Sequence, residues 1–258
     1  MARTLLTIAL FLAFSSMGNP QMKAPADVGI DEKLGKQVAL DVVLKDENAN
    51  DLTLSRLVDK PTVLMFNYYS CPGICPVLLN SMVDVVNQIQ LEPGKDFRLI
   101  SISFDPADTP EQARKKKANY LNMLKRQFSP DAWHFLTGSA ENTKAVADSA
   151  GFNYRKEGDM YVHPGAIMVL TPKGIISRYL YGTTFLIADV AMAIREAAGG
   201  KVRPTISKVL SFCYTYDPAG RTYVFSITRF VGAAILALAA LFLIFILRGK
   251  SSKKDETS

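Results

Sequence analysis

The sequence is short of cysteine and histidine, the residues that most often bind transition metals. Its 258 residues include only three cysteines and two histidines. We find no cluster of oxygen ligands of the kind that binds calcium or magnesium. There is also no basic patch interleaved with aromatic residues, although the net charge is +6. Internal repeats and low-complexity segments are lacking. These absences argue against nucleic-acid binding and repeat architectures, and they make the few cysteines the most informative residues.

Two of the three cysteines lie close together. Cys71 and Cys75 occur in Tyr-Ser-Cys-Pro-Gly-Ile-Cys-Pro at 69–76, directly after the apolar run 61–69 and before an amphipathic segment. Positions i and i+4 share one face of a helix, so both sulfurs can point at one atom. Helical i,i+4 Cα atoms are about 6 Å apart, which also permits a disulfide. The pair predicts either a metal site or a redox-active dithiol.

The pattern of apolar runs predicts an α/β sandwich. The expected elements are a hairpin from 38–44 and 52–54; strands at 61–69, 97–104, 133–136, 166–170 and 175–181; and helices at 77–89, 109–127, 140–150 and 185–198. Strands that alternate with helices around buried runs are typical of this class. A cysteine pair where a strand passes into a helix predicts a thioredoxin-like domain, here with an N-terminal hairpin extension.

The two ends of the chain carry predicted targeting segments. Residues 1–18 have a basic start, an apolar core and a small-residue exit, which predict a signal peptide. The alternative is an uncleaved N-terminal anchor. We then expect a leader at 19–35, the thioredoxin-like domain at 36–200, a juxtamembrane linker at 201–228, a transmembrane helix at 229–248 and a cytoplasmic tail at 249–258.

Charge sets the expected orientation of the predicted transmembrane helix. Residues 230–247 include no charged side chain, and 18 residues of helix span about 27 Å, close to the hydrocarbon thickness. Four basic residues follow the segment: Arg248, Lys250, Lys253 and Lys254. By the positive-inside rule the tail faces the cytoplasm. We therefore expect a single-pass protein of the bacterial inner membrane with its domain on the periplasmic side.

The two histidines differ in context. His134 lies within the alternating segment 131–136, where we interpret it as an ordinary strand or surface residue. His163 precedes Pro164 in a loop that enters the strand 166–170, and a residue before proline is held extended. Most loop histidines are not ligands, so position alone leaves the role of His163 open.

Ligand chemistry favours copper over other metals. Two thiolates favour copper(I), and an added imidazole also accommodates copper(II). A structural zinc site would normally need four protein ligands, and no fourth is obvious.

Several segments resemble the Sco/SenC family of copper-binding cytochrome c oxidase assembly factors. They are residues 31–35, 68–76, 101–110 (Ser-Ile-Ser-Phe-Asp-Pro-Ala-Asp-Thr-Pro), 133–138 and 163–181, in this order, within about 28–200. The resemblance implies a thioredoxin-like fold and one copper ion held by Cys71, Cys75 and His163. It also implies delivery of that copper to subunit II of the oxidase, with an upstream copper donor and a thiol reductant as further partners.

Some residues depart from the family pattern or remain without a role. Many family members have Asp-His-Ser at the histidine, whereas this chain has Val162-His163-Pro164, which removes a carboxylate beside the imidazole. Asp105 and Asp108 could approach the site, but we favour helix capping and loop solvation for them. Cys213, before the predicted transmembrane helix, receives no role.

Three classes of function follow. The first is a metallochaperone that passes copper on by ligand exchange. The second is a thiol–disulfide oxidoreductase acting on the oxidase cysteines, with Cys71 as nucleophile and Cys75 as resolving thiol. The third and least favoured is a tethered scaffold with a structural disulfide. A peroxidase is weaker than the oxidoreductase, because no Thr-x-x-Cys pattern is present.

Overall fold

The computed structural model describes residues 28–203, 214–217, 222–225, 235 and 238. The chain divides into two compact units, 1–203 and 204–258. Within the second unit, β12 (Tyr214–Asp217) pairs antiparallel with β13 (Thr222–Phe225). The predicted signal peptide, Cys213 and nearly all of the predicted transmembrane helix lie outside the described residues. In the part of the chain that is described, we find no helix with the length and apolarity needed to cross a membrane.

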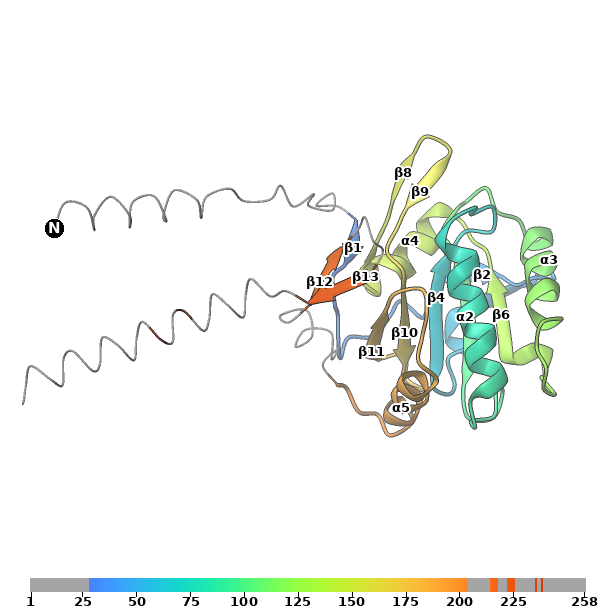
Figure 1. The fold of residues 1–258 in the computed structure, drawn as a ribbon. Coiled ribbons are helices and arrows are strands. Elements are labelled where there is room, and N and C mark those ends of the chain that lie inside the picture. Colours follow the sequence, from blue (N-terminus) through green and yellow to red (C-terminus); the bar gives the residue numbers. More distant parts are fainter. Residues whose placement is uncertain (1–27, 204–213, 218–221, 226–234, 236–237, 239–258) are drawn as a thin grey trace, which may run out of the picture. The chain divides into compact units, whose positions relative to one another are not determined.

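The first unit is built on a five-stranded sheet with the order β11-β10-β4-β5-β6 (Figure 1). Its strands are β4 (Thr62–Asn67), β5 (Arg98–Ser103), β6 (Trp133–Leu136), β10 (Ala166–Leu170) and β11 (Ile176–Tyr181). β4, β5 and β6 run parallel, and β10 is antiparallel to both β4 and β11. The central strands are buried on both faces, which explains why most of their side chains are apolar. The α/β class and the order of these strands along the chain match the predictions.

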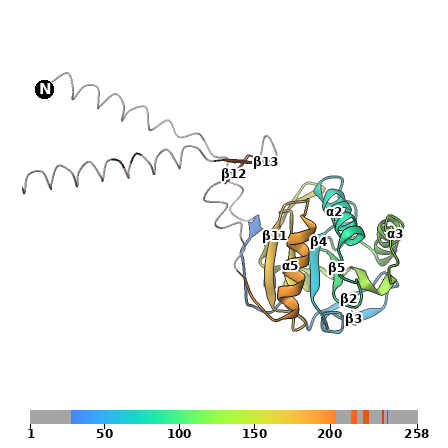
Figure 2. The same cartoon turned by 60° about the horizontal axis from the view of Figure 1, so that its bottom comes forward.

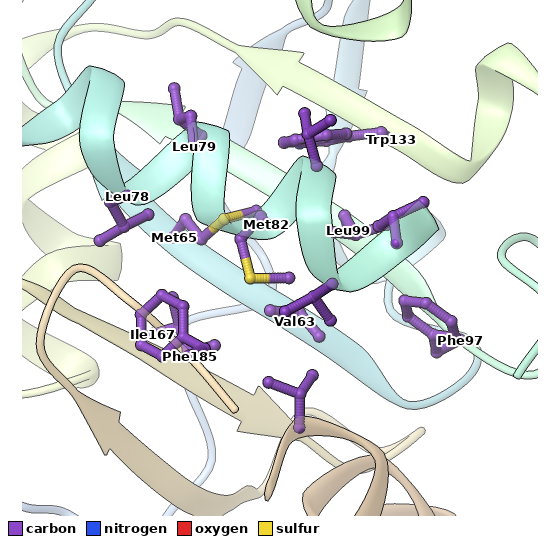
Figure 3. Close-up of a cluster of buried hydrophobic side chains, with 14 of the residues drawn as sticks. Val63, Met65, Leu78, Leu79, Met82, Phe97, Leu99, Trp133, Ile167 and Phe185 are labelled. Atoms are coloured by element: carbon purple, nitrogen blue, oxygen red, sulfur yellow. The ribbon is translucent and has the colours of Figure 1, made fainter. Parts of the chain in front are cut away.

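Helices cover both faces of this sheet. α2 (Ile74–Gln88), α3 (Pro110–Leu121) and α5 (Ile187–Ala198) pack on one face, with α3 and α5 at opposite ends of the layer (Figure 2). Side chains of α2 such as Leu78 and Met82 fill the space over Val63 and Met65 of β4 (Figure 3). α4 (Ala140–Ser149) covers the other face, together with the hairpin of β2 (Val43–Lys45) and β3 (Asp51–Thr53) and the short helix η1 (Leu54–Arg56). Another short helix, η2 (Pro130–Ala132), leads into β6.

Two helix boundaries differ from the predicted ones by three residues or more. α2 begins at Ile74, three residues before the predicted start, because Pro76 is compatible with the first helical turn, where its missing N–H is not needed. α3 ends at Leu121 instead of 127. The segment after it turns back onto α2, where the Arg126 guanidinium donates to the carbonyls of Val86, Ile89 and Leu91. A tertiary contact with the end of another helix therefore replaces the last predicted turns.

The segment 152–162 contains strands that we did not predict. β7 (Phe152–Asn153) pairs with β1 (Gly29–Ile30), and β8 (Arg155–Glu157) forms a hairpin with β9 (Met160–Val162). The hairpin turns at Gly158, which has a φ of 61°, and it extends away from the sheet (Figure 1). It leads directly into the loop that carries His163.

Candidate metal centre

Cys71 and Cys75 lie at the carboxyl end of β4. Cys71 is in the turn that follows the strand, where its N–H donates to the carbonyl of Tyr68 at 3.2 Å. Cys75 is in the first turn of α2. Both thiols are free, and the two residues are only 7% and 3% exposed. The pair lies at the start of a helix, where the positive end of the helix dipole favours negatively charged groups such as thiolates. The Gly73 N–H also donates to the Cys71 Sγ at 3.4 Å.

His163 completes a group of three potential ligands. Its Nε2 lies 3.4 Å from the Cys75 Sγ, although 88 residues separate them in the chain. The two sulfurs and the imidazole nitrogen all lie within 4.8 Å of one another. Thiolate and imidazole bonds of about 2.0–2.3 Å to one ion allow ligand atoms up to roughly 4.6 Å apart. The separations in this group are therefore close to those that one metal ion can bridge.

The other imidazole nitrogen also has a partner. The His163 Nδ1 lies 3.1 Å from the carbonyl oxygen of Pro164. In the tautomer with the proton on Nδ1, this N–H donates to the carbonyl and the Nε2 lone pair faces the thiols. A carbonyl acceptor of this kind orients a ligating histidine in many metal sites. The sequence predicted the loss of a neighbouring carboxylate at this position, and the structure shows a backbone oxygen at the same imidazole.

The two thiols have opposite acidities. The pKa of Cys71 is lowered because the Cys75 thiol donates a hydrogen bond to its sulfur, and His163 and the Gly73 N–H add to this effect against the opposing effect of burial. The pKa of Cys75 is raised, because the same hydrogen bond and its burial both favour the protonated thiol. Cys71 is therefore the more acidic of the two thiols.

Aromatic rings form the wall behind His163. The ring centroids of Phe104, Tyr68 and Phe152 lie 5.3, 6.0 and 6.1 Å from that of His163. Burial, followed by a hydrogen bond to Cys71, raises the pKa of Tyr68 to about 12. Tyr68 thus stays a neutral phenol at physiological pH. The apolar run 61–69 predicted that Tyr68 is buried near the end of a strand. Nothing in the sequence indicated that its ring contacts His163.

The remaining candidates lie outside the group of three. His134 is on β6, separated from β4 by β5, and burial lowers the pKa of its imidazole. The Asp105 carboxylate accepts from the Ala107 N–H at 3.0 Å and from the Tyr161 hydroxyl at 3.3 Å. Asp108 is buried and accepts from the backbone of Tyr69. The favoured interpretation of Asp105 as a loop residue fits its contact with the Ala107 N–H. Asp108 is buried, so the loop solvation expected for it does not occur.

The chain belongs to the SCO1/SenC family, whose family model matches residues 31–199. This confirms the resemblance inferred from the cysteine turn and the histidine loop. Among curated relatives, a protein of Stutzerimonas stutzeri named as a candidate copper-binding protein is 28% identical over 143 residues, covering 53% of this chain and 66% of that protein. The mitochondrial SCO2 homolog of Homo sapiens is 31% identical over 145 residues, covering 52% of this chain and 50% of that protein. The match thus spans about half to two thirds of these relatives' own length.

Solved structures show the same fold. A crystal structure of a protein from Aquifex aeolicus is 29% identical with a TM-score of 0.59, covering 65% of this chain and 95% of that one. The structure of Arabidopsis thaliana ScoI, which was solved with copper bound, is 25% identical with a TM-score of 0.51, covering 62% of this chain and 96% of that one. The thioredoxin-like α/β fold predicted for the domain is therefore confirmed.

Proposed function

We propose that this protein is a copper metallochaperone that binds one copper ion through Cys71, Cys75 and His163. The observation that carries the proposal is the convergence of two thiols and one imidazole nitrogen within 4.8 Å of one another. Two sulfur ligands and one imidazole suit copper in either oxidation state. The copper-bound structure of a relative with the same fold supports this choice of metal.

The coordination of the site suits transfer of the ion. Three protein ligands leave room for a donor atom from another protein to bind the same ion before the first ligands release it. The sulfurs are buried, but His163 is only half-buried, so the histidine side is where an incoming ligand would reach the ion. A site with four buried protein ligands would hold its metal as a structural element.

The acceptor we propose is the copper centre of cytochrome c oxidase subunit II, with an upstream copper donor and a thiol reductant as further partners. Sco proteins take part in assembly of cytochrome c oxidase, which supports an oxidase as the destination. We also propose that the domain is attached to the inner membrane and faces the periplasm, as the terminal segments of the sequence predict. Fractionation of cells and protease protection of the tagged C-terminus test this placement.

Competitive copper(I) binding tests the metal site. The full-length protein, reduced under anaerobic conditions, is titrated with copper(I) against a chromophoric chelator. It is compared with Cys71→Ser, Cys75→Ser and His163→Ala, and with His134→Ala as a matched histidine control. We expect one tightly bound copper per chain, lost or strongly weakened in the first three variants and retained in the fourth. Binding that is unaffected by His163→Ala would disprove the three-ligand site.

A thiol–disulfide oxidoreductase is the second candidate, favoured by the lowered pKa of Cys71 beside the higher pKa of Cys75. This asymmetry is typical of an attacking thiolate with a resolving partner. In this alternative, reduction of a disulfide in a peptide from the oxidase copper site would require both cysteines and would continue in His163→Ala. The metallochaperone requires His163, so this one variant separates the two functions.

A further inference from the structure

Asp108 lies beneath the loop that carries Cys71. Its carboxylate oxygen Oδ2 accepts the backbone N–H of Tyr69 at 2.5 Å and the Ser103 hydroxyl at 2.6 Å. The residue is only 7% exposed, and Tyr69 and Ser103 are buried as well. Asp108 belongs to the segment between β5 and α3, and it is joined here to the segment between β4 and α2. Its carboxylate therefore connects two neighbouring segments at the carboxyl edge of the sheet.

The bond to Tyr69 fixes the backbone two residues before Cys71. The Tyr69 side chain is held independently, because its hydroxyl donates to the Leu136 carbonyl at 2.8 Å. The other partner, Ser103, is the last residue of β5 and lies opposite Asn67, the last residue of β4. The cysteine loop is the segment 68–73 between β4 and α2. Its beginning is attached to the ends of β5 and β6, and Asp108 accepts the hydrogen bond from its backbone.

Other roles for Asp108 do not fit these contacts. It does not cap α3, because Thr109 is the N-cap and forms a reciprocal capping box with Gln112. It is not one of the three residues whose ligand atoms converge. Loop solvation is excluded by its burial. The residue is a buried acceptor for the cysteine loop.

We propose that Asp108 is a positioning residue, which holds the Tyr69–Cys71 backbone so that the Cys71 sulfur faces Cys75 and His163. The consequence for copper rests on the proposed function, whereas the consequence for the loop does not. Groups that orient metal ligands typically change metal affinity by about 10- to 100-fold when they are replaced. Asp108→Ala removes the acceptor, and Asp108→Asn keeps an oxygen that can accept from Tyr69.

Hydrogen exchange of the metal-free protein tests the loop. In Asp108→Ala we expect the Tyr69 amide to exchange at least about tenfold faster than in the wild type, while amides inside β4 and β10 keep their protection. Asp108→Asn restores most of the protection of Tyr69. Unchanged exchange of the Tyr69 amide in a folded Asp108→Ala protein overturns the proposal, and this result does not depend on copper.

Copper(I) competition with the full-length protein tests the consequence for the site. We expect a loss of about tenfold in affinity for Asp108→Ala and recovery to within about threefold of the wild type for Asp108→Asn. Glu111→Gln, which removes a neighbouring exposed charge paired with Lys115, is the charge control. Lys117→Met, which breaks a buried ion pair next to β6, is the control for lost stability. Both controls should retain wild-type affinity.

The outcomes separate the two proposals. A wild-type protein that binds no copper rejects the proposed function, and the amide exchange still decides the role of Asp108. Wild-type copper affinity in Asp108→Ala rejects the positioning role. If Asp108→Ala does not fold, Asp108→Ser, whose shorter side chain stays polar but lacks the carboxylate, takes its place. A faster Tyr69 amide in Asp108→Ser supports the role, and an unchanged one overturns it.

Discussion

The Sγ of Cys75 lies 3.4 Å from the Nε2 of His163, across 88 residues of sequence. Cys75 is placed by the first turn of α2, and His163 by the loop between β9 and β10. β10 pairs directly with β4, and this pairing brings the two segments together. The contact joins a soft sulfur ligand to an imidazole in a largely buried setting, a combination that suits copper.

The acidity of Cys71 gives the first prediction. Because the hydrogen bond from Cys75, more than any other contact, lowers the pKa of Cys71, we expect its sulfur to remain a thiolate below neutral pH. Alkylation of the reduced, metal-free protein by iodoacetamide should occur first at Cys71, with a rate nearly independent of pH between about 5 and 8. An ordinary thiol would slow about tenfold for each unit below a pKa of about 8.5. Peptide mapping by mass spectrometry measures the rate at each cysteine, and faster reaction at Cys75 would contradict the assignment.

The buried ion pair of Lys117 and Glu47 gives the second prediction. The two side chains are 9% and 8% exposed, and Glu47 also accepts the Phe135 N–H at 3.3 Å. Removing one partner leaves a buried charge, so Lys117→Met should lower the free energy of unfolding by about 3–5 kcal/mol. Chemical denaturation measures this. In the double variant with Glu47→Leu, most of the loss should be recovered, and purely additive losses would show that the charges do not interact.

His134 gives a prediction of pH dependence. Burial lowers the pKa of its imidazole, outweighing the opposite effect of Glu47, and Lys117, Arg98 and Asp131 are the other charged groups that act on it. The unfolded chain therefore binds a proton more readily than the folded one as the pH falls below about 6.5. Stability should decline with falling pH in that window. In His134→Gln, the loss of stability caused by protonation of His134 should disappear. Urea unfolding at pH 7.5 and 5.5 measures the decline in both proteins. An identical decline in wild type and variant would exclude His134 as its source.

Asn67 gives the fourth prediction. It ends β4 just before the cysteine loop, it is 1% exposed, and neither polar atom of its side chain has a hydrogen-bond partner among the described residues. An unpaired buried amide costs about 1–3 kcal/mol. Asn67→Leu, which has a similar volume, should therefore raise the free energy of unfolding by about that amount. A loss of stability in thermal and urea unfolding would show instead that the amide contributes favourably to the folded protein.

The apolar runs of the sequence were enough to predict most strands of the central sheet. The segments 61–69, 97–104 and 133–136 enclose β4, β5 and β6, because strands that are largely buried are rich in apolar side chains. The segment 152–162 was missed because β8 and β9 are short and polar, and their residues are mostly exposed. Such strands carry no periodicity that distinguishes them from a loop.

The sequence by itself determined the chemistry of the candidate site. Cys71 and Cys75 are four residues apart at a strand-to-helix turn, so their proximity is a local property of the chain. The family resemblance implied His163 as the third ligand, but only the tertiary structure placed it beside the cysteines, because pairing of β10 with β4 is a long-range event that no local pattern records. That pairing moves His163 from an ordinary loop residue to a neighbour of Cys75, and the adjacent parallel strand β5 leads into the segment that places Asp108 under the cysteine loop.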